Sequence, residues 1–228
     1  MIHLRRPYVR VYATMSVDGK IASRTGDSRL SCPYDKVRLH SMRSVVDGVM
    51  VGANTVIKDD PQLTVRLVKG RNPVRVVVDG SLKIPLNARV LDVSVAPTII
   101  VTSSVADLGK VRQLRSLGVD VVVIESESTQ VSMSRVLEAL YEKGLKDLLV
   151  EGGGTLLWSL VSQRLVDEFR ITVSPFIIGG RDSVSLVGGE GFGDMSEWLK
   201  LKLVGHEICK CGNEIHLVYR VTTGSPVL

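Results

Sequence analysis

The sequence predicts an α/β protein: a mainly parallel central sheet with helices on both faces and an antiparallel hairpin near the C-terminal end. Three observations predict this class. Short apolar segments typical of strands alternate with helical patterns, which implies parallel strands joined by right-handed crossovers. Hydrophobic residues make up 44% of the 228 residues but aromatic residues only 4%, so Val, Leu and Ile dominate, as in buried parallel sheets. Residues 198–222 alternate in polarity around Gly212-Asn213, which favours a hairpin.

The elements of the first half of the chain follow from local signals. Residues 8–14 are rich in β-branched and aromatic residues and precede a turn at Asp18-Gly19, so we expect a strand there. Proline is favoured at the first helical position, so Pro33 begins a helix over 33–44. Pro61 ends a short helix over 55–59. The remaining elements are buried strands predicted from short apolar runs: 46–52, 72–80 and 96–103.

In the second half of the chain, glycines mark where two helices end. Gly118 follows a helix over 105–117 and Gly144 follows one over 131–143, and glycine suits a left-handed cap at both places. A third helix follows the glycine run and extends over 155–165. Apolar runs predict the remaining strands: 119–125, 145–151 and 166–180. No repeat, low-complexity segment or linker interrupts this pattern, so we expect one domain spanning residues 1–228.

Composition excludes some functions. No apolar run approaches the roughly 20 residues of a membrane span, so we expect a soluble, cytoplasmic protein without a membrane partner. The net charge of +5 comes from dispersed Lys and Arg residues, which favours small phosphorylated ligands over nucleic acid. Cys32, Cys209 and Cys211 form no disulfide framework. No second cysteine pair or His cluster completes a zinc site beside Cys209 and Cys211, so we expect no metal.

A glycine loop follows the strand predicted at 145–151. Gly152, Gly153 and Gly154 allow a ligand to approach the backbone, and the N-terminus of the next helix favours an anion such as a pyrophosphate. A tight turn without a ligand is the alternative. Glu151 would repel a phosphate, so it faces a second ligand with hydroxyls or amines, or else is an exposed acid at the strand end.

Residues 52–66 form a second loop at the carboxyl edge of the predicted sheet, where ligands of α/β proteins bind. Asp59 and Asp60 lack a third ligand for a metal, and consecutive side chains rarely face one ion or act as an acid/base pair. We expect Thr55 and one aspartate to face a ribose or amide, with Arg66 free to hold a phosphate bidentately. A surface turn ended by proline is the alternative.

Several segments occur in an order that resembles the reductases of riboflavin biosynthesis, which form the C-terminal domain of the bifunctional deaminase–reductase. The most specific segments are VDGVMVGANTVIKDDPQLTVR (46–66) and LLVEGGGTLLW (148–158). The others are TMSVDGKIAS (14–23), GDSR (26–29), NPVRVVVDG (72–80) and IPLNARVL (84–91). The resemblance covers nearly the whole chain and is strongest to the stand-alone archaeal reductases.

The resemblance implies a dihydrofolate-reductase-like three-layer α/β/α fold, a homodimer, and NADPH as hydride donor, with NADH as a possible substitute. The substrate would be a phosphorylated ribosylaminopyrimidine whose ring-opened imine is reduced at C1′. Glu151 would orient the sugar or assist proton movement. Cofactor contacts would come from Thr14, Leu30, Thr55, Asp59, Gly80, Ser81, Gly152, Gly153, Gly154, Thr155 and Leu156. Substrate contacts would come from Ser28, Arg43, Leu63, Arg66 and Glu151.

The sequence departs from the family pattern at one point and leaves two rival functions. Gly80 stands where many members have serine. The contact that the serine hydroxyl would make with the cofactor is therefore lost here or is taken over by Ser81. The zinc signature of the deaminase is absent.

A dihydrofolate reductase is disfavoured because it needs a helix acid that binds the pteridine. The helix over 33–44 offers only Asp35, near its start, and then basic residues. A basic nucleotide- or RNA-binding module is the non-enzymatic rival.

Overall fold

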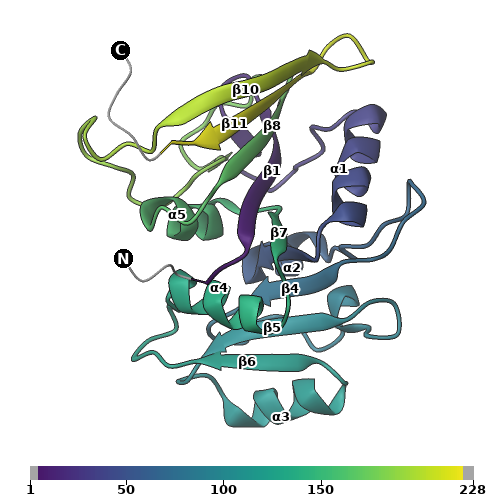
Figure 1. Cartoon of the computed structure of the whole chain (residues 1–228), viewed down its shortest axis with the longest axis vertical. Helices are drawn as coiled ribbons and strands as arrows, with labels where there is room; N and C mark the ends of the chain where they lie inside the picture. Colours follow the sequence, from purple (N-terminus) through teal and green to yellow (C-terminus); the bar gives the residue numbers. More distant parts are fainter. Residues whose placement is uncertain (1–4, 223–228) are drawn as a thin grey trace.

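The structure, a computed structural model, describes residues 5–222 and contains one nine-stranded sheet with the order β10-β11-β8-β1-β7-β3-β4-β5-β6. Figure 1 shows this sheet running from β10 at the top to β6 near the bottom. Its strands are β1 (Tyr8–Ser16), β3 (Gly48–Gly52), β4 (Val74–Val78), β5 (Thr98–Ser103), β6 (Asp120–Ile124), β7 (Asp147–Val150), β8 (Glu168–Ser174), β10 (Leu201–Ile208) and β11 (Ile215–Val221). The helices are α1 (Pro33–Val45), α2 (Ala53–Asp59), α3 (Leu108–Ser116), α4 (Met133–Glu142) and α5 (Gly154–Ser162).

The predicted three-layer α/β/α architecture is confirmed. Strands β8, β1, β7, β3, β4, β5 and β6 are mutually parallel, and β11 and β10 add the predicted antiparallel hairpin. Successive side chains of a strand point to opposite faces, so Val76 packs with the α4–α5 layer and Val77 with the α1–α2–α3 layer. The central strands are buried on both faces, which explains their continuous apolar runs.

The strand order places the candidate site. The chain leaves β1, forms β3 to β6 on one side, and returns with β7 between β1 and β3. The loop after β7 therefore begins at the centre of the sheet, next to the loop after β3. In an open parallel sheet this carboxyl edge, where strand order reverses, is the usual ligand position.

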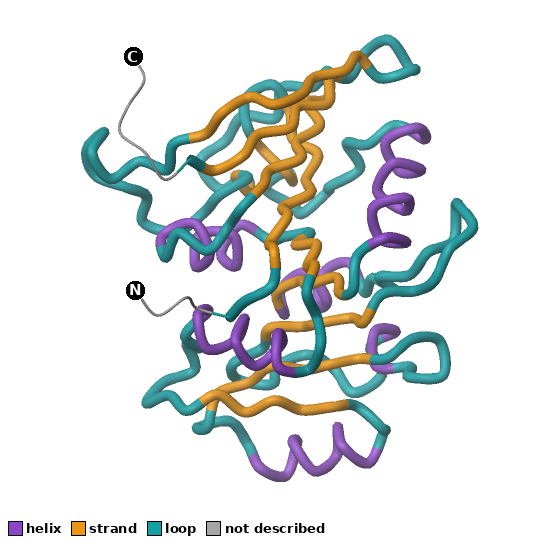
Figure 2. Tube along the Cα trace, viewed as in Figure 1, coloured by secondary structure: helices purple, strands orange, loops and turns teal. Residues whose placement is uncertain are grey.

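Three short elements were not predicted: the small sheet of β2 (Lys20–Ala22) and β9 (Val184–Ser185), and the 3-10 helix η1 (Arg89–Leu91). The strand predicted over 166–180 was too long. It ends at Ser174, because the carboxylate of Asp18 accepts hydrogen bonds from the N–H groups of Ile178 and Gly179 and turns the chain away. Figure 2 shows the long loop after β8 passing beside α5. None of the helices between residues 5 and 222 is long and apolar enough to span a bilayer.

Candidate active site

The glycine loop leaves the centre of the sheet and starts α5. The N–H of Gly52, at the end of β3, donates to the carbonyl of Gly152 at 3.1 Å, which joins the two loops predicted to bind ligands. Gly152 has φ of 103°, a conformation that L side chains rarely adopt. A Cβ on Gly154 would lie 2.8 Å from the carbonyl oxygen of Ser185, in β9. Glycine is therefore required at both positions by the backbone itself.

The N-terminus of α5 suits an anion. Its N-cap is Gly153, so no side chain caps the first N–H groups of the helix. Those groups have no partner within the helix, and together with the helix dipole they favour a phosphate group. The hydroxyl of Thr55 lies beside this turn, 3.5 Å from where a Cβ of Gly153 would stand. The geometry fits a pyrophosphate on the glycine loop with Thr55 at its side.

A buried ion pair lies directly before the glycine loop. Arg43, on α1, donates through Nε to Oε1 of Glu151 at 2.7 Å and through Nη2 to Oε2 at 2.6 Å. Both side chains are at most 10% exposed. Burial alone would lower the pKa of Arg43, but the charge and hydrogen bonds of Glu151 outweigh burial and raise it. The two residues predicted to contact substrate separately therefore neutralise each other, and substrate would meet them as one unit.

Arg66 lies next to this pair, and its charge is not neutralised by it. The carbonyl of Thr64 accepts a hydrogen bond from Arg43 at 3.0 Å, while its hydroxyl accepts one from Arg66 at 2.5 Å. Burial and the charge of Arg43 lower the pKa of Arg66, and no ion pair joins Arg66 to a carboxylate within residues 5–222. An exposed guanidinium beside a second arginine favours a phosphate.

His40 supports the same loop and was missed by the sequence analysis. Its Nδ1 accepts a hydrogen bond from the backbone N–H of Arg66 at 2.8 Å, and the side chain is 5% exposed. Burial, followed by the charges of Arg43 and Arg66, lowers its pKa to about 4. Periodicity places His40 on the same helix as Arg43, but its contacts with the N–H groups of Arg66 and Leu67 depend on how that loop packs on α1.

The two adjacent aspartates point to different partners. Asp60 ends α2 in the left-handed conformation, with φ of 38°, and its carboxylate accepts a hydrogen bond from the N–H of Arg89 at 2.8 Å. Asp59 forms no ion pair within the described part of the chain, and burial raises its pKa. The structure therefore shows Asp60 fixing the loop. The cofactor contact of Asp59 stays a prediction, and so does the substrate contact of Leu63, which is buried with φ of 53°.

Thr14 lies at the edge of a buried polar network, which the sequence analysis also missed. Its hydroxyl donates to Asp35 at 2.6 Å, and the same carboxylate accepts hydrogen bonds from Tyr12 and Thr172. Asp35 is 1% exposed. The acid in the first turn of α1 is thus enclosed by hydroxyl donors.

The other predicted site residues are not joined to this cluster by side-chain contacts. Ser28 and Ser81 are exposed, and Leu30 is buried. Gly80 has a packing reason to lack a side chain: a Cβ there would lie 1.8 Å from the carbonyl oxygen of Thr129. A serine at position 80 does not fit this structure. Thr155 and Leu156 occupy the first turn of α5 as predicted.

Comparison with known proteins gives consistent matches. Residues 7–217 match the family model described as the RibD C-terminal domain. The chain is 41% identical to a protein of Aquifex aeolicus, covering 89% of this chain and 92% of that protein, and 44% identical to one of Methanothermobacter thermautotrophicus, covering 87% and 91%. Both are named 2,5-diamino-6-ribosylamino-4(3H)-pyrimidinone 5′-phosphate reductase.

Solved structures agree with the fold. The deaminase/5-amino-6-(5-phosphoribosylamino)uracil reductase of Thermotoga maritima matches with a TM-score of 0.75 and 32% identity, over 96% of this chain and 57% of that one. Dihydrofolate reductase from Enterococcus faecalis matches with a TM-score of 0.53 and 11% identity, over 94% and 96%. The dihydrofolate-reductase-like fold predicted from the sequence is confirmed.

Proposed function

The chain belongs to the RibD C-terminal domain family, and from this membership we propose that it reduces 2,5-diamino-6-ribosylamino-4(3H)-pyrimidinone 5′-phosphate in riboflavin biosynthesis, using NADPH. The product would carry a ribitylamino chain in place of the ribosyl group. The observation that carries this proposal is identity of 41–44% to relatives of that name over nearly their whole length.

The site's geometry supports a nicotinamide cofactor on the glycine loop. The uncapped turn at Gly153–Leu156 would hold the pyrophosphate, and Thr55 would contact it or the adjoining ribose. When bound, the cofactor would supply the hydride. Hydride transfer requires the nicotinamide ring to lie in van der Waals contact with C1′ of the substrate. These residues would therefore act by positioning the cofactor. NADPH is proposed over NADH on the family resemblance.

The neighbouring arginines support a phosphorylated substrate. Arg66 would hold the 5′-phosphate, because its guanidinium is exposed and unpaired among residues 5–222. The Arg43–Glu151 pair would bind hydroxyls or amines of the substrate through the remaining lone pairs of the carboxylate. In this arrangement Glu151 orients the sugar.

The proposal is tested by incubating the chain with NADPH and the ribosylamino-pyrimidine phosphate while following absorbance of the reduced cofactor. We expect oxidation of one NADPH per product, with the ribitylamino compound identified by mass. Dihydrofolate in place of the substrate should give no turnover. If the chain consumed dihydrofolate and left the pyrimidine phosphate unchanged, the proposal would be wrong.

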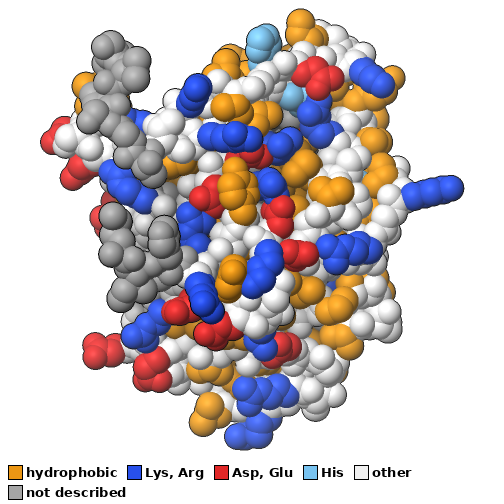
Figure 3. Space-filling view, viewed as in Figure 1, with side chains coloured by type: hydrophobic (Ala, Val, Ile, Leu, Met, Phe, Trp, Pro, Cys, Tyr) orange, Lys and Arg blue, Asp and Glu red, His pale blue; other side chains and the backbone are white. Residues whose placement is uncertain are grey.

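A non-enzymatic RNA-binding role is less well supported. Figure 3 shows Lys and Arg side chains mixed with acidic ones on the face in view, whereas a nucleic-acid site needs a continuous basic surface.

A homodimer is part of the proposal. The outer strand β10 exposes Leu201, Leu203 and Ile208, and an exposed apolar edge strand favours association. Light scattering coupled to gel filtration would measure the mass.

A further inference from the structure

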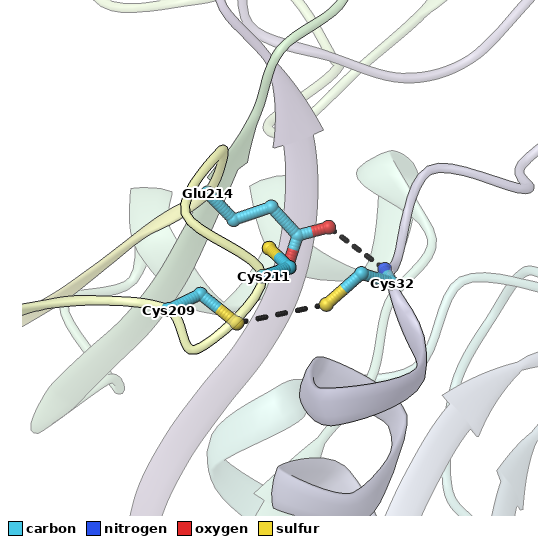
Figure 4. Close-up of side chains that lie close together, drawn as sticks. All are labelled: Cys32, Cys209, Cys211 and Glu214. Atoms are coloured by element: carbon cyan, nitrogen blue, oxygen red, sulfur yellow. Dashed lines mark hydrogen bonds between the residues drawn. The ribbon is translucent and has the colours of Figure 1, made fainter.

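Three cysteines and a glutamate gather at the turn between β10 and β11, away from the glycine loop. They are Cys32, Cys209, Cys211 and Glu214, and their ligand atoms all lie within 4.8 Å of one another. Figure 4 shows the four side chains around a common space, Cys32 approaching from the start of α1 and the others from the hairpin turn. No metal was expected from the sequence, because no second cysteine pair or His cluster lies near Cys209 and Cys211 in the chain. The fold adds Cys32, which is 177 residues from Cys209 in sequence but lies beside it in space.

From this cluster we propose a structural zinc site, with three thiolates and one carboxylate oxygen as ligands. The distances fit: the sulfurs of Cys32 and Cys209 are 3.6 Å apart. Two thiolates on a tetrahedral zinc, with bonds of about 2.3 Å, would be about 3.8 Å apart. Four protein ligands leave no open position, which is typical of a structural and not a catalytic zinc.

The carboxylate of Glu214 is the second, independent sign of a missing ligand. The residue is 4% exposed, and its Oε1 accepts a hydrogen bond from the N–H of Cys32 at 2.7 Å. Its Oε2 is buried and has no hydrogen-bond partner among the described residues. No ion pair to Lys or Arg compensates it within residues 5–222. A buried carboxylate oxygen without a partner is costly, and a cation at the centre of the cluster would satisfy it.

The surrounding backbone is arranged as around metal-bound thiolates. The N–H of Asp35 points to the sulfur of Cys32 at 3.4 Å, and Cys32 caps the N-terminus of α1. The hairpin turn is closed by two hydrogen bonds of 2.8 Å, from Gly212 to Cys209 and from Cys209 to Glu214. With Oε1 of Glu214 held by a backbone N–H, Oε2 is left to bind as a single ligand.

A neighbouring set of potential ligands, Asp35, Glu214 and His216, is weaker. Asp35 already accepts hydrogen bonds from three hydroxyl groups, and Nδ1 of His216 lies 2.8 Å from the hydroxyl of Thr172. A zinc ion bound by Cys32 and the three hairpin residues would join the hairpin to the start of α1 and to the preceding segment that carries Leu30. This proposal does not rest on the proposed function.

The test uses the whole chain expressed with added zinc and purified without a chelator. We expect about one zinc per chain by elemental analysis. Replacement by Co²⁺ should give thiolate-to-cobalt charge-transfer absorption and the intense visible bands of a tetrahedral site. Cys211→Ser and Cys32→Ser should each weaken zinc binding by more than about 100-fold, and Glu214→Gln by at least about 10-fold. Glu190→Gln, at an exposed acid outside the cluster, is the charge-matched control and should bind zinc normally.

Two results would overturn the proposal. One is wild-type protein that retains no zinc after dialysis and gives no cobalt bands. The other is a disulfide between Cys32 and Cys209, shown by non-reducing peptide mapping in protein that excludes metal. The wild-type titration decides even if a cysteine variant does not fold. Chelation of the loaded wild-type protein should also lower its melting temperature, because metal bound only to the folded state stabilises it.

Discussion

At the scale of single residues, the buried pair of Arg43 and Glu151 is the feature with the clearest energetic consequence. Removing one charge leaves the other buried without a partner, which costs about 3–5 kcal/mol. We predict that Glu151→Gln lowers the free energy of unfolding, measured with urea, by about 3 kcal/mol. The double variant Arg43→Met/Glu151→Leu should recover at least half of that loss. A loss below about 1 kcal/mol in Glu151→Gln would contradict a buried ion pair.

Arg66 is predicted to act on binding and not on folding, because its side chain is exposed. Arg66→Gln should raise KM for the phosphorylated substrate by about 10–100-fold, which is the value of one charged hydrogen-bonded contact. Stability should be nearly unchanged. Lys69→Gln, at an exposed cation in the same loop, is the matched control and should keep the wild-type KM. Equal effects of the two variants would indicate general charge attraction without a defined phosphate site.

His40 gives a prediction about pH. Burial, Arg43 and Arg66 lower its pKa from 6.5 to about 4, so the unfolded chain takes up a proton near pH 6.5 while the folded chain stays neutral until about pH 4. The stability that depends on neutral His40 is therefore complete above pH 6.5 and is lost as pH falls to 4, by roughly 3 kcal/mol.

The matched variant is His40→Asn, whose side-chain oxygen can accept the hydrogen bond from Arg66 but does not titrate. Its free energy of unfolding, followed by urea denaturation from pH 7 to pH 4, should fall less steeply than that of the wild-type protein. Parallel curves for the two proteins would show that His40 does not carry the acid sensitivity.

At the scale of elements, the helices and strands were largely predictable, because the glycines at 118 and 144, Pro33 and the apolar runs are local signals. The end of β8 was not, because the contact of Asp18 with residues 178–179 is distant in sequence. The cysteine–glutamate cluster was missed for the same reason. Its members come from two segments that only the folded sheet brings together.

The loop after β4 carries a prediction of its own. Serine at position 80 would place a Cβ 1.8 Å from a backbone carbonyl, so Gly80→Ser should lower the free energy of unfolding by about 1–3 kcal/mol. Gly205→Ser is the control, since its Cβ would lie 3.8 Å from Val218 and glycine is unfavourable within a strand. We expect Gly205→Ser to be as stable as the wild-type protein in urea. If Gly80→Ser were equally stable, the loop at residue 129 would not be packed on Gly80.

At the scale of the whole molecule, strand–helix alternation predicted the parallel sheet but not its order. The return of β7 between β1 and β3 is a long-range event, and it is this return that joins the glycine loop to Gly52 and Thr55. The sequence could therefore name the residues of the two loops. It could not show that Glu151 binds Arg43 or that Asp60 binds Arg89, because these pairs depend on the packing of α1 and η1 against the sheet edge.

Since the cofactor would contact loops from several strands, its binding should stabilise the molecule as a whole. A ligand that binds only the folded state, at 100 times its Kd, adds about 2.7 kcal/mol to the free energy of unfolding. For a chain of this size each kcal/mol corresponds to about 2–4 °C, so NADPH should raise the melting temperature by roughly 5–11 °C. Single-stranded RNA at the same phosphate concentration is the control, and it should leave the melting temperature unchanged, because basic and acidic side chains are mixed on the face that Figure 3 shows. Stabilisation by RNA and not by NADPH would favour the nucleic-acid rival. Stabilisation by NADPH alone would support the cofactor-binding part of the proposed function, because the measurement reports binding without requiring turnover.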